Sequence, residues 1–263
     1  MFIGNTVYTH TSISRFDACP FRYKGICVDM CVPRDGGPPI EFFVARCVSD
    51  ALKRLYREVI SGRLPAIGEA IETYGAIWNE EYSGEVLISR PGASAREYFD
   101  AGKERVARYF TRYWPFNQSE IIQNDLLVAF FLRPESRGFP LVTMLDRIDR
   151  RADGAHEVHI YLTSESLPHE KLRQDLEIGF NLLGFRHQFP DIENVELVRH
   201  DLTNDEEKLV TMTARDLVRI EAEIMRLITT IENDKKFEPR KSEFCKWCEW
   251  GLELCASMSS SNR

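Results

Sequence analysis

The sequence predicts an α/β fold in which one sheet is flanked by helices and carries a helical annex. Three observations support this class: helical spacing of apolar residues up to about residue 116, a run of extended segments after residue 118, and a return to helical spacing near residue 169. Helices and strands in this order bury their apolar faces by packing around one sheet. At 263 residues and 43% hydrophobic content, the chain is long enough for such a core.

Helical periodicity comes first along the chain. Ser12 or Ser14 is expected to cap a short helix that ends near Cys19-Pro20 or continues past it. Apolar residues then recur with a period near 3.6, which predicts three helices, over residues 40–60, 67–82 and 94–113. Ser61-Gly62, Ser83-Gly84 and Pro115 end them.

The second half contains the predicted strands. Segments rich in β-branched and aromatic residues, separated by Gly, Pro and Asp turns, predict strands over residues 120–132, 140–150, 156–163, 195–202 and 208–213. Helices are predicted over residues 169–189 and 214–232. Residues 144–150 and 157–163 are expected to form a hairpin through Ala152-Asp153-Gly154. An acidic pair, Asp146 and Asp149, lies on its first strand.

Charge and hydropathy exclude several classes of protein. The net charge of −7 and the pI near 5.5 give no general attraction to nucleic acid, so contact with phosphates would need a local basic surface. No apolar run reaches the length of a membrane span, and residues 1–10 lack the pattern of a signal peptide. We therefore expect a cytoplasmic protein without a membrane partner.

Cysteines at both ends of the chain indicate a metal or cluster site. Seven cysteines are too few for a disulfide scaffold in a chain of this length. Cys245-x-x-Cys248 with Cys255 has metal-ligand spacing, and Cys19-Pro20 supplies a fourth thiol. Four thiolates suit zinc or a [4Fe–4S] cluster. Such a site would join the two ends of the chain as a structural clamp, shielded by Trp247 and Trp250; the other cysteines, Cys27, Cys31 and Cys47, are expected to be buried thiols.

Residues 12–23, Ser-Ile-Ser-Arg-Phe-Asp-Ala-Cys-Pro-Phe-Arg-Tyr, carry a resemblance to a known family. They are similar to the S-x-S-x-x-x-x-C-P-x-x-[FY] motif of RecB/AddB-type iron–sulfur nucleases of the PD-(D/E)XK superfamily, which includes RecB-like exonucleases associated with CRISPR adaptation. The resemblance implies a restriction-endonuclease-like mixed sheet and a [4Fe–4S] cluster on Cys19, Cys245, Cys248 and Cys255. The last two cysteines are separated by six residues here, and commonly by five in that family.

The resemblance also implies a domain plan for the chain. One nuclease-like domain would span residues 1–263. The clamp would take residues 11–31 and 240–257, the helical annex residues 40–116, and the nuclease-fold core residues 118–232.

The catalytic motifs of the family are only partly present. Residues 143–149, Thr-Met-Leu-Asp-Arg-Ile-Asp, resemble G-x-I-D-R-[VI]-D, which places Asp146 at the metal-binding acid. Ile160-Tyr161-Leu162-Thr163 aligns with [IV]-D-Y-K-T, so Ile160 replaces the second acid and Leu162 the lysine. Strand alternation puts both substituted side chains on one face, where neither can bind Mg²⁺.

Two further positions follow the same trend. Ser49 stands where the family's G-x-x-x-H-x-x-L pattern has a histidine, and of the Q-x-x-x-Y motif only Gln174 remains, with Ile178 at the tyrosine. Glu157 and His159 are expected to point to the opposite strand face, so a bulge or a shift of register would be needed to recruit them. Glu165, Glu170 and Lys171 are other candidate donors. A buried Asp146 would need a partner, for which Arg147 or Arg150 is expected.

The helix over residues 94–113 is the candidate DNA-binding element. It carries Arg105, Arg108 and Arg112 with interleaved aromatic residues, a composition that can follow a single strand through phosphate contact and stacking. An ordinary amphipathic helix with buried aromatics and solvated arginines explains the same composition, and acidic residues dilute its charge.

Taken together, the leading hypothesis is a catalytically degenerate, [4Fe–4S]-containing nuclease-fold protein that binds DNA or a nuclease or helicase partner in repair, recombination or defence. One alternative is an active exonuclease that uses Mg²⁺ or Mn²⁺ through relocated ligands. Another is a structural protein-interaction subunit that does not bind DNA.

Overall fold

The computed structural model describes residues 6–31, 38–88, 90–132, 138–162 and 172–241, together with Cys245, Cys248 and Cys255. Contacts divide the chain into two compact units. Unit 1 contains Met1–Gly36, Ala129–Thr143 and Ala214–Arg263, and unit 2 contains Gly37–Val128 and Met144–Thr213. The proposed clamp segments therefore belong to unit 1, and the predicted helical annex belongs to unit 2 with most of the strands.

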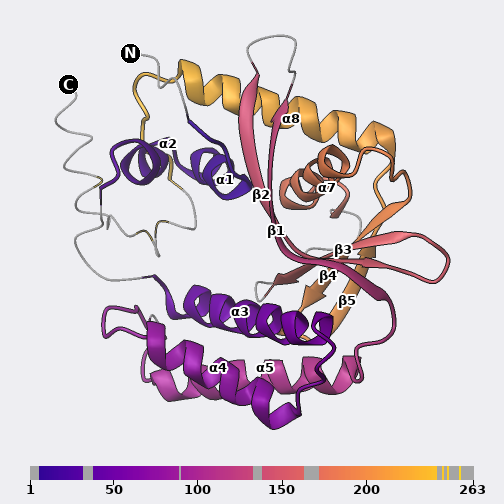
Figure 1. Ribbon diagram of the computed structural model, residues 1–263. Helices are drawn as coiled ribbons and strands as arrows, with labels where there is room; N and C mark the ends of the chain where they lie inside the picture. The colour runs from indigo at the N-terminus through magenta and orange to yellow at the C-terminus, as the bar shows by residue number, and fades with distance from the viewer. Residues whose placement is uncertain are drawn as a thin grey trace. The chain divides into compact units, whose positions relative to one another are not determined.

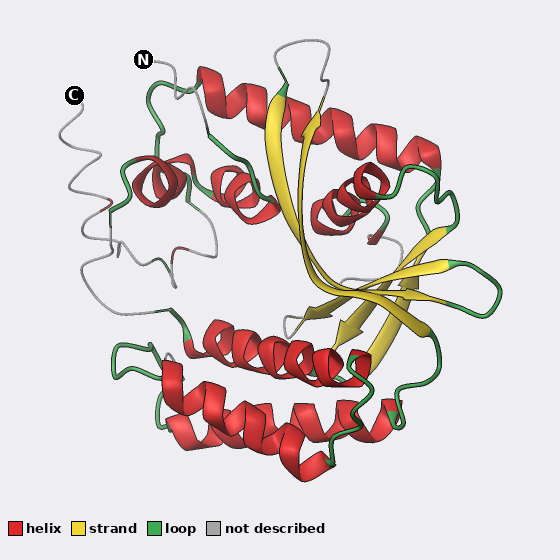
Figure 2. Cartoon of the chain, viewed as in Figure 1, coloured by secondary structure: helices red, strands yellow, loops and turns green. Residues whose placement is uncertain are grey.

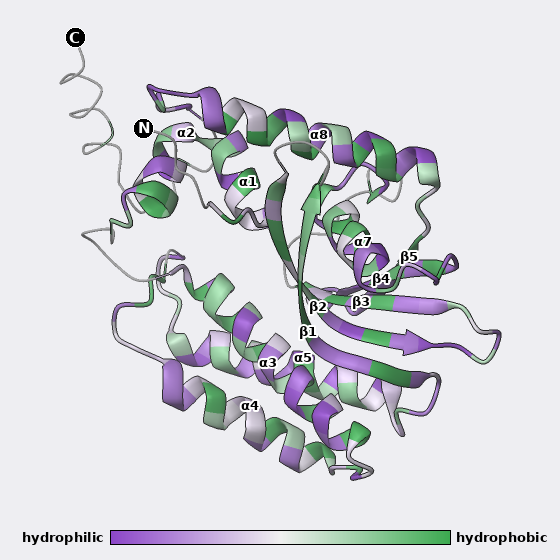
Figure 3. Cartoon of the chain, turned by 45° about the horizontal axis from the view of Figure 1, so that its top comes forward, coloured by the Kyte–Doolittle hydropathy of each residue, from purple (hydrophilic) through white to green (hydrophobic). Residues whose placement is uncertain are grey.

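Three helices of unit 2 pack side by side: α3 (Ile40–Ile60), α4 (Ile67–Glu81) and α5 (Ala95–Tyr113) (Figure 1). Polar and apolar bands alternate along α3 and α4, as Figure 3 shows, because each helix buries one face and exposes the other. Ser94 caps α5 in a capping box with Glu97. The bounds agree with the three predicted helices to within two residues.

Five strands form one mixed sheet in the order β1-β2-β3-β4-β5 (Figure 2). They are β1 (Glu120–Leu132), β2 (Phe139–Arg150), β3 (His156–Leu162), β4 (Val195–Asp201) and β5 (Glu206–Val210). β2 and β3 pair antiparallel, as do β4 and β5, whereas β3 and β4 pair parallel. The parallel pair is joined through α7 (Leu176–Gln188), as a parallel pair requires a crossover.

The two faces of the sheet in unit 2 carry different side chains. Arg147 pairs with His159 across β2 and β3, so the odd-numbered residues of both strands share one face. Tyr56 of α3 and Tyr109 of α5 contact Arg147 on that face. On the other face α7 packs against β3 and β4, where the rings of Phe185 and His156 lie 6.2 Å apart. The predicted α/β class, a mixed sheet flanked by helices, is confirmed.

Unit 1 contains α1 (His10–Ala18), α2 (Pro20–Tyr23), a π-helical turn η1 (Lys24–Val28) and α8 (Ala214–Asn233). Thr9 caps α1, and Ser12 completes the capping box from the third helical position. The predicted cap at Ser12 or Ser14 was therefore wrong, because the helix begins earlier than the apolar pattern indicated. α1 packs on α8, and the Tyr8 hydroxyl donates to Glu232 at 2.5 Å.

The remaining predicted elements also agree with the structure at most of their ends. β1 has the predicted bounds, and β2, β3 and α8 differ by one residue at an end. The helix predicted from residue 169 is described from Leu176 onward as α7, and residues 163–171, including Thr163, Glu165, Glu170 and Lys171, lie outside the described part of the chain. None of the described helices combines the length and apolar character needed to cross a membrane.

Candidate functional site

Asp146 is a mostly buried residue of β2 that makes two specific contacts. Its Oδ2 accepts a hydrogen bond from the Tyr161 backbone N–H at 3.0 Å, and its Oδ1 lies 3.1 Å from Nζ of Lys53. Burial raises the pKa of the Asp146 carboxyl, while Lys53 and the Tyr161 N–H oppose the rise. The expected partners were wrong, because Arg147 pairs with Asp149 and Arg150 pairs with Glu120.

The Lys53 ammonium lies between two carboxylates. Its Nζ is 3.0 Å from Oδ1 of Asp125 and 3.1 Å from Oδ1 of Asp146, and Arg57 contacts the other oxygen of Asp125 at 2.5 Å. Burial lowers the pKa of Lys53, but the two carboxylates outweigh that effect and the net shift is upward. Lys53 therefore keeps its charge between two acids, which is the kind of position that a divalent cation also takes.

Local backbone structure brings these groups together. Asp125 has φ +58°, an uncommon conformation for a residue other than glycine. Next to it, the Asn124 side chain donates to the backbone carbonyl of Lys53 at 2.9 Å. β1 is thus fixed to α3 beside the Asp125–Lys53 ion pair.

The β2–β3 register places the substituted motif positions beside Asp146. Because Arg147 pairs with His159, the next residues along the ladder bring Asp146 next to Ile160. Ile160 is 3% exposed, and Leu162 is partly buried at the end of β3. Ser49 lies on α3 one turn before Lys53. The aliphatic side chains of Ile160 and Leu162 cannot supply a metal ligand.

The residues at the start of α7 include one buried carboxyl. Gln174 is exposed in the turn before the helix, so it does not enter a buried site. Asp175 caps α7 by accepting from the N–H of Glu177. Burial and the charges of Asp175 and Asp146 raise the pKa of Glu177 to about 7, against the effect of Arg199.

Arg147 is the centre of a buried polar network on the face that carries the odd-numbered residues. Its Nε donates to Oδ1 of Asp149 at 2.9 Å, and its Nη1 donates to the hydroxyls of Tyr109 and Tyr161 at 2.8 and 2.9 Å. The guanidinium carbon lies 4.0 Å from the centroid of the Tyr56 ring. A buried guanidinium is stabilised only by such a complete set of partners.

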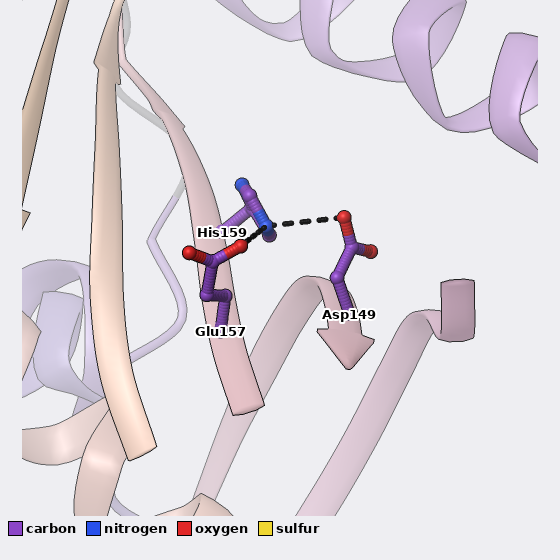
Figure 4. Close-up of side chains that lie close together, drawn as sticks. All are labelled: Asp149, Glu157 and His159. Atoms are coloured by element: carbon purple, nitrogen blue, oxygen red, sulfur yellow. Dashed lines mark ion pairs between the residues drawn. The ribbon is translucent and has the colours of Figure 1, made fainter. Parts of the chain in front are cut away.

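Asp149, Glu157 and His159 form a compact cluster next to Arg147 (Figure 4). Nε2 of His159 lies 3.3 Å from Oδ2 of Asp149 and 3.6 Å from Oε2 of Glu157. One ligand atom from each residue lies within 4.8 Å of the other two. Glu157 and His159 thus remain on the face that the strand alternation predicted. They meet Asp149 there, and not Asp146.

A chain of hydrogen-bonding groups continues from His159 to the surface of unit 2. Nδ1 of His159 is 2.9 Å from Nε2 of His200, and Nδ1 of His200 is 3.2 Å from the Tyr113 hydroxyl, which donates to Glu207. Burial and the charges of His159 and Arg147 hold the pKa of His200 well below its usual range. His200 is therefore neutral near pH 7.

A cavity of about 260 Å³ opens beside this cluster within unit 2. Its lining includes Asp149, Glu157 and His159 together with Tyr113, Arg147, Arg151 and Glu207. Gln118 and Ser119 add uncharged polar groups to the wall. The cluster thus borders a space large enough for water molecules or a small ligand.

The arginines of α5 are partly used to hold unit 2 together. Arg108 donates to the backbone carbonyls of Leu202 and Thr203 at 3.3 and 3.2 Å, and Arg112 donates to that of Asp205 at 2.7 Å. Arg105 is half-buried, and burial lowers its pKa. Two aromatics of the helix, Tyr109 and Phe110, belong to the core, so they are not free to stack on bases.

The four clamp cysteines all belong to unit 1. Burial raises the pKa of the Cys255 thiol, and charges on Cys19, Cys248 and Cys245 raise it further. The Arg240 backbone N–H donates to Sγ of Cys19 at 3.4 Å, which brings the end of the chain to α1. Trp247 and Trp250 lie outside the described residues.

The expectation for the other three cysteines was only partly correct. Cys47 is buried, Cys27 is half-buried and accepts from Arg15 at 3.3 Å, and Cys31 is exposed.

Sequence reasoning missed Lys53, Asp125 and Glu177. Lys53 had a signal, since it lies four residues after Ser49 and therefore on the same face of α3. Glu177 had a weaker one, as an acid three residues after Gln174 at the start of a helix. Asp125 had none, because its orientation depends on a positive φ inside a strand.

The family model described as the PD-(D/E)XK nuclease superfamily matches residues 8–255. Among solved structures, the "Crystal structure of SSO0001" aligns at 15% sequence identity over 93% of this chain and 84% of that chain, with a TM-score of 0.42. No curated protein matches the sequence. Because the family model covers nearly the whole chain, the protein belongs to the PD-(D/E)XK nuclease superfamily.

Proposed function

We propose that this protein is a non-catalytic member of its superfamily that binds DNA, with the Lys53 ammonium in the place of a metal ion beside Asp146. The observation that supports this most directly is the position of Lys53, 3.0 Å from Asp125 and 3.1 Å from Asp146. Metal-assisted phosphodiester hydrolysis needs a divalent cation that polarises the phosphate and activates water. An ammonium group offers neither a Lewis acid nor an open coordination position.

The neighbouring side chains support the same proposal. Ile160 and Leu162 make the strand next to Asp146 apolar, so a cation there would have few oxygen ligands. Mg²⁺ binding would also have to displace Lys53 from Asp146 and leave its mostly buried ammonium with Asp125 as its one remaining acidic partner among the described residues. The shortage of oxygen ligands and the displacement of Lys53 both act against metal binding at Asp146.

DNA binding is supported by membership of a nuclease superfamily and by the arginines of α5. Arg108 and Arg112 keep about two-fifths of their side-chain surface exposed, at 38% and 41%. Their contacts with the turn after β4 hold them in fixed positions, which favours phosphate contact over base stacking. We expect affinity without strong sequence preference.

We further propose that Cys19, Cys245, Cys248 and Cys255 hold a [4Fe–4S] cluster that cross-links separate segments of unit 1. Four thiolates are the ligand set that such a cluster takes, and the charges of the other three cysteines raise the pKa of the Cys255 thiol. Zinc is the chemical competitor for the same donors. Anaerobic purification should give a brown protein with broad visible absorption, whereas a colourless preparation with stoichiometric zinc would rule the cluster out.

An active nuclease with relocated ligands is the second candidate, and Glu177 is the observation that favours it. The pKa of this partly buried carboxyl of α7 is raised, with the charge of Asp146 as one contribution, and under this candidate Glu177 would be the second carboxylate ligand of a divalent cation at Asp146. Lys53 would then stand in for the motif lysine that Leu162 replaces. Mg²⁺ or Mn²⁺ would be required only under this candidate.

A nuclease assay separates the two candidates. Anaerobically prepared protein is incubated with end-labelled single-stranded and duplex DNA in Mg²⁺ or Mn²⁺. We expect no cleavage. Metal-dependent cleavage that Asp146→Ala abolishes would overturn the non-catalytic proposal, and its loss in Glu177→Gln would identify the relocated ligand.

Fluorescence anisotropy tests the DNA-binding half of the proposal. The double variant Arg105→Ala, Arg108→Ala should weaken binding of an oligonucleotide. It should also lower the salt dependence of binding, because fewer counterions are released when fewer phosphate contacts form. Arg226→Ala is the matched control, because Arg226 is an exposed arginine on α8 that pairs only locally with Glu223. Wild-type protein that binds no DNA would favour a structural protein-interaction subunit instead, including one that serves a nuclease or helicase partner.

A further inference from the structure

We propose that Asp149, Glu157 and His159 form a binding site for one divalent transition-metal cation, separate from Asp146. The three side chains converge (Figure 4). The site lies on the face of the sheet that carries Arg147 and borders the cavity of about 260 Å³. Asp149 is the last residue of the segment that resembles G-x-I-D-R-[VI]-D, but the site uses neither the metal-binding acid of that motif, Asp146, nor the positions of the second acid and the lysine, Ile160 and Leu162. The proposal therefore stands or falls independently of the proposed function.

The distances between the three residues suit a shared cation. Ligand atoms about 2.0–2.1 Å from a metal and arranged tetrahedrally are separated by roughly 3.3 Å. His159 Nε2 lies 3.3 Å from Oδ2 of Asp149 and 3.6 Å from Oε2 of Glu157. Small side-chain rotations would bring all three atoms to binding distance.

Each candidate ligand is held by a second residue through its other polar atom. Arg147 Nε donates to Oδ1 of Asp149 at 2.9 Å, leaving Oδ2 toward His159. Arg151 Nη1 contacts Oε1 of Glu157 at 3.4 Å, leaving Oε2 toward His159. Outer partners of this kind orient the ligands of metal sites in proteins.

His159 supplies the observation that points to a ligand. Its side chain is 6% exposed, and among the described residues its Nε2 has no hydrogen-bond partner although it faces both carboxylates. A buried polar atom without a hydrogen bond is costly. A cation bound at Nε2 would satisfy it.

The hydrogen-bond chain behind His159 is compatible with this state. With Nε2 on a metal, the proton of the neutral ring lies on Nδ1, which can donate to Nε2 of His200 at 2.9 Å. His200 then donates from Nδ1 to the Tyr113 hydroxyl, and that hydroxyl donates to Glu207. Each donor along this chain meets an acceptor, and Nη2 of Arg147, which also lies 2.9 Å from Nδ1 of His159, would have to turn away from that ring.

The competing occupant is a proton. If Nδ1 instead accepts from Nη2 of Arg147, also at 2.9 Å, Nε2 carries the proton and no cation binds. The lining carboxylates Asp149, Glu157 and Glu207 outnumber the lining guanidiniums Arg147 and Arg151, so the local charge is negative and attracts a cation. One imidazole and two carboxylates suit Mn²⁺, Fe²⁺ or Zn²⁺, with the cavity side open to water.

Titration with Mn²⁺, followed by electron paramagnetic resonance of the free ion, tests the site in the full chain. Mn²⁺ is chosen because it binds thiolates poorly and therefore avoids the clamp cysteines. We expect Glu157→Gln and His159→Gln each to weaken binding at least tenfold. Glu196→Gln is the matched control: Glu196 pairs with Glu157 across β3 and β4 and contacts the same Arg151, but it lies outside the cluster.

Asp146→Asn and pulsed resonance complete the test. Binding that persists in Asp146→Asn, with a nitrogen coupling on the bound Mn²⁺ that His159→Gln removes, would support the proposal. Loss of binding in Asp146→Asn but not in Glu157→Gln would assign the cation to Asp146 instead and overturn it. Absence of binding at millimolar Mn²⁺, in wild-type protein shown to be folded by circular dichroism, would overturn it as well.

Discussion

At the scale of single residues, Lys53 sets the electrostatics around Asp146. A carboxylate that is mostly buried needs a compensating charge, and a lysine of α3 provides it from 93 residues earlier in the chain. The same ammonium compensates Asp125, so one side chain serves two acids. Loss of that charge would leave two carboxylates with a shared need for a cation.

The variant Lys53→Met tests this role. We expect the free energy of unfolding to fall by about 1–4 kcal/mol, because Asp146 and Asp125 lose a mostly buried partner. Added Mn²⁺ should restore part of the loss by binding between the two carboxylates, measured as the melting temperature with and without the ion. Arg57→Met is the control: its guanidinium is 58% exposed and pairs with Asp125 among the described residues, so its melting temperature should respond to Mn²⁺ no more than that of wild type does. Equal metal responses in both variants would contradict the prediction.

Glu177 predicts a pH dependence of stability. Its pKa is raised from 4.5 to about 7 in the folded protein, so the folded state holds the proton more tightly than the unfolded state does. Because of this difference in proton binding, the free energy of unfolding falls as pH rises from about 4.5 to 7. Above that range the whole destabilisation by the Glu177 carboxylate is present. Glu177→Gln removes this destabilisation.

We therefore expect Glu177→Gln to be more stable than wild type at pH 8, on the order of 1–3 kcal/mol, and nearly equal to it at pH 4.5. Urea unfolding at the two pH values measures the difference. A stabilisation that is the same at both would show that packing, and not the carboxyl charge, is responsible.

Replacing the Arg147 side chain by an uncharged one is expected to cause a large loss of stability. Arg147→Met would leave Asp149 buried without its guanidinium and would empty the centre of the tyrosine network, at a cost of about 3–5 kcal/mol. Arg150→Met, three residues along the same strand, removes an exposed pair with Glu120 and should cost less than about 0.5 kcal/mol. Chemical denaturation of both variants gives the comparison, and similar losses would show that the buried network contributes little.

At the scale of elements, the β2–β3 pair carries two separate acidic sites, one on each face. Side chains alternate between the faces of a strand, so Asp146 and Asp149, three residues apart, point to opposite sides. Asp146 meets Lys53, whereas Asp149 meets Arg147, Glu157 and His159. One hairpin therefore offers two acidic sites that cannot share a cation.

The contact between α4 and α5 depends on a glycine. A Cβ added at Gly102 of α5 would lie 2.1 Å from the Tyr74 hydroxyl, closer than any real contact, so the ring or the helix would have to move. We expect Gly102→Ala to destabilise unit 2 by about 1–3 kcal/mol in spite of the higher helix propensity of alanine.

Gly75→Ala in α4 provides the matched comparison. Its added Cβ meets only Phe99 at 3.8 Å, an ordinary contact, so the propensity gain of up to about 1 kcal/mol should remain. Thermal unfolding followed by circular dichroism distinguishes the two. A neutral Gly102→Ala would show that Tyr74 moves aside without cost.

At the scale of the whole molecule, the two units draw on different sources of stability. Unit 2 has a large apolar core in which α3, α4 and α5 bury Phe43, Leu52, Tyr74 and Phe110. Unit 1 joins both ends of the chain through α1, α8 and the cysteine residues. Its rings Phe16, Tyr23 and Phe237 pack together.

Removal of the proposed cluster should therefore loosen unit 1 selectively. In Cys19→Ser, we expect amides of α1 and of the segment before Cys245 to exchange hydrogen at least tenfold faster, while those of α3 keep their protection. Cys31→Ser, which changes an exposed thiol, is the control and should leave exchange unchanged. Hydrogen–deuterium exchange by mass spectrometry measures both, and unaltered exchange in Cys19→Ser would argue against a structural clamp.

Much of the fold could be predicted because it depends on local rules. Apolar spacing gave α3 its bounds, alternation gave the β2–β3 pair, and a capping serine located the start of α5. The start of α1 was misplaced because Thr9 and Ser12 are both good capping residues. For the site, the sequence also predicted that the apolar residues Ile160 and Leu162 lie on the strand next to Asp146. The length of the turn between the two strands sets which residues face each other.

The sequence by itself therefore determined the α/β class and the hairpin that carries Asp146 and Asp149, and it predicts that Ile160 and Leu162 stand where the motif has its second acid and its lysine. Only the tertiary structure decided what those acids contact. Lys53 reaches Asp146 and Asp125, and Arg147 is enclosed by tyrosines of α3, α5 and β3. The physical reason is that backbone conformation and burial pattern are set by near neighbours in the chain, whereas the convergence of charged side chains depends on how separate elements dock.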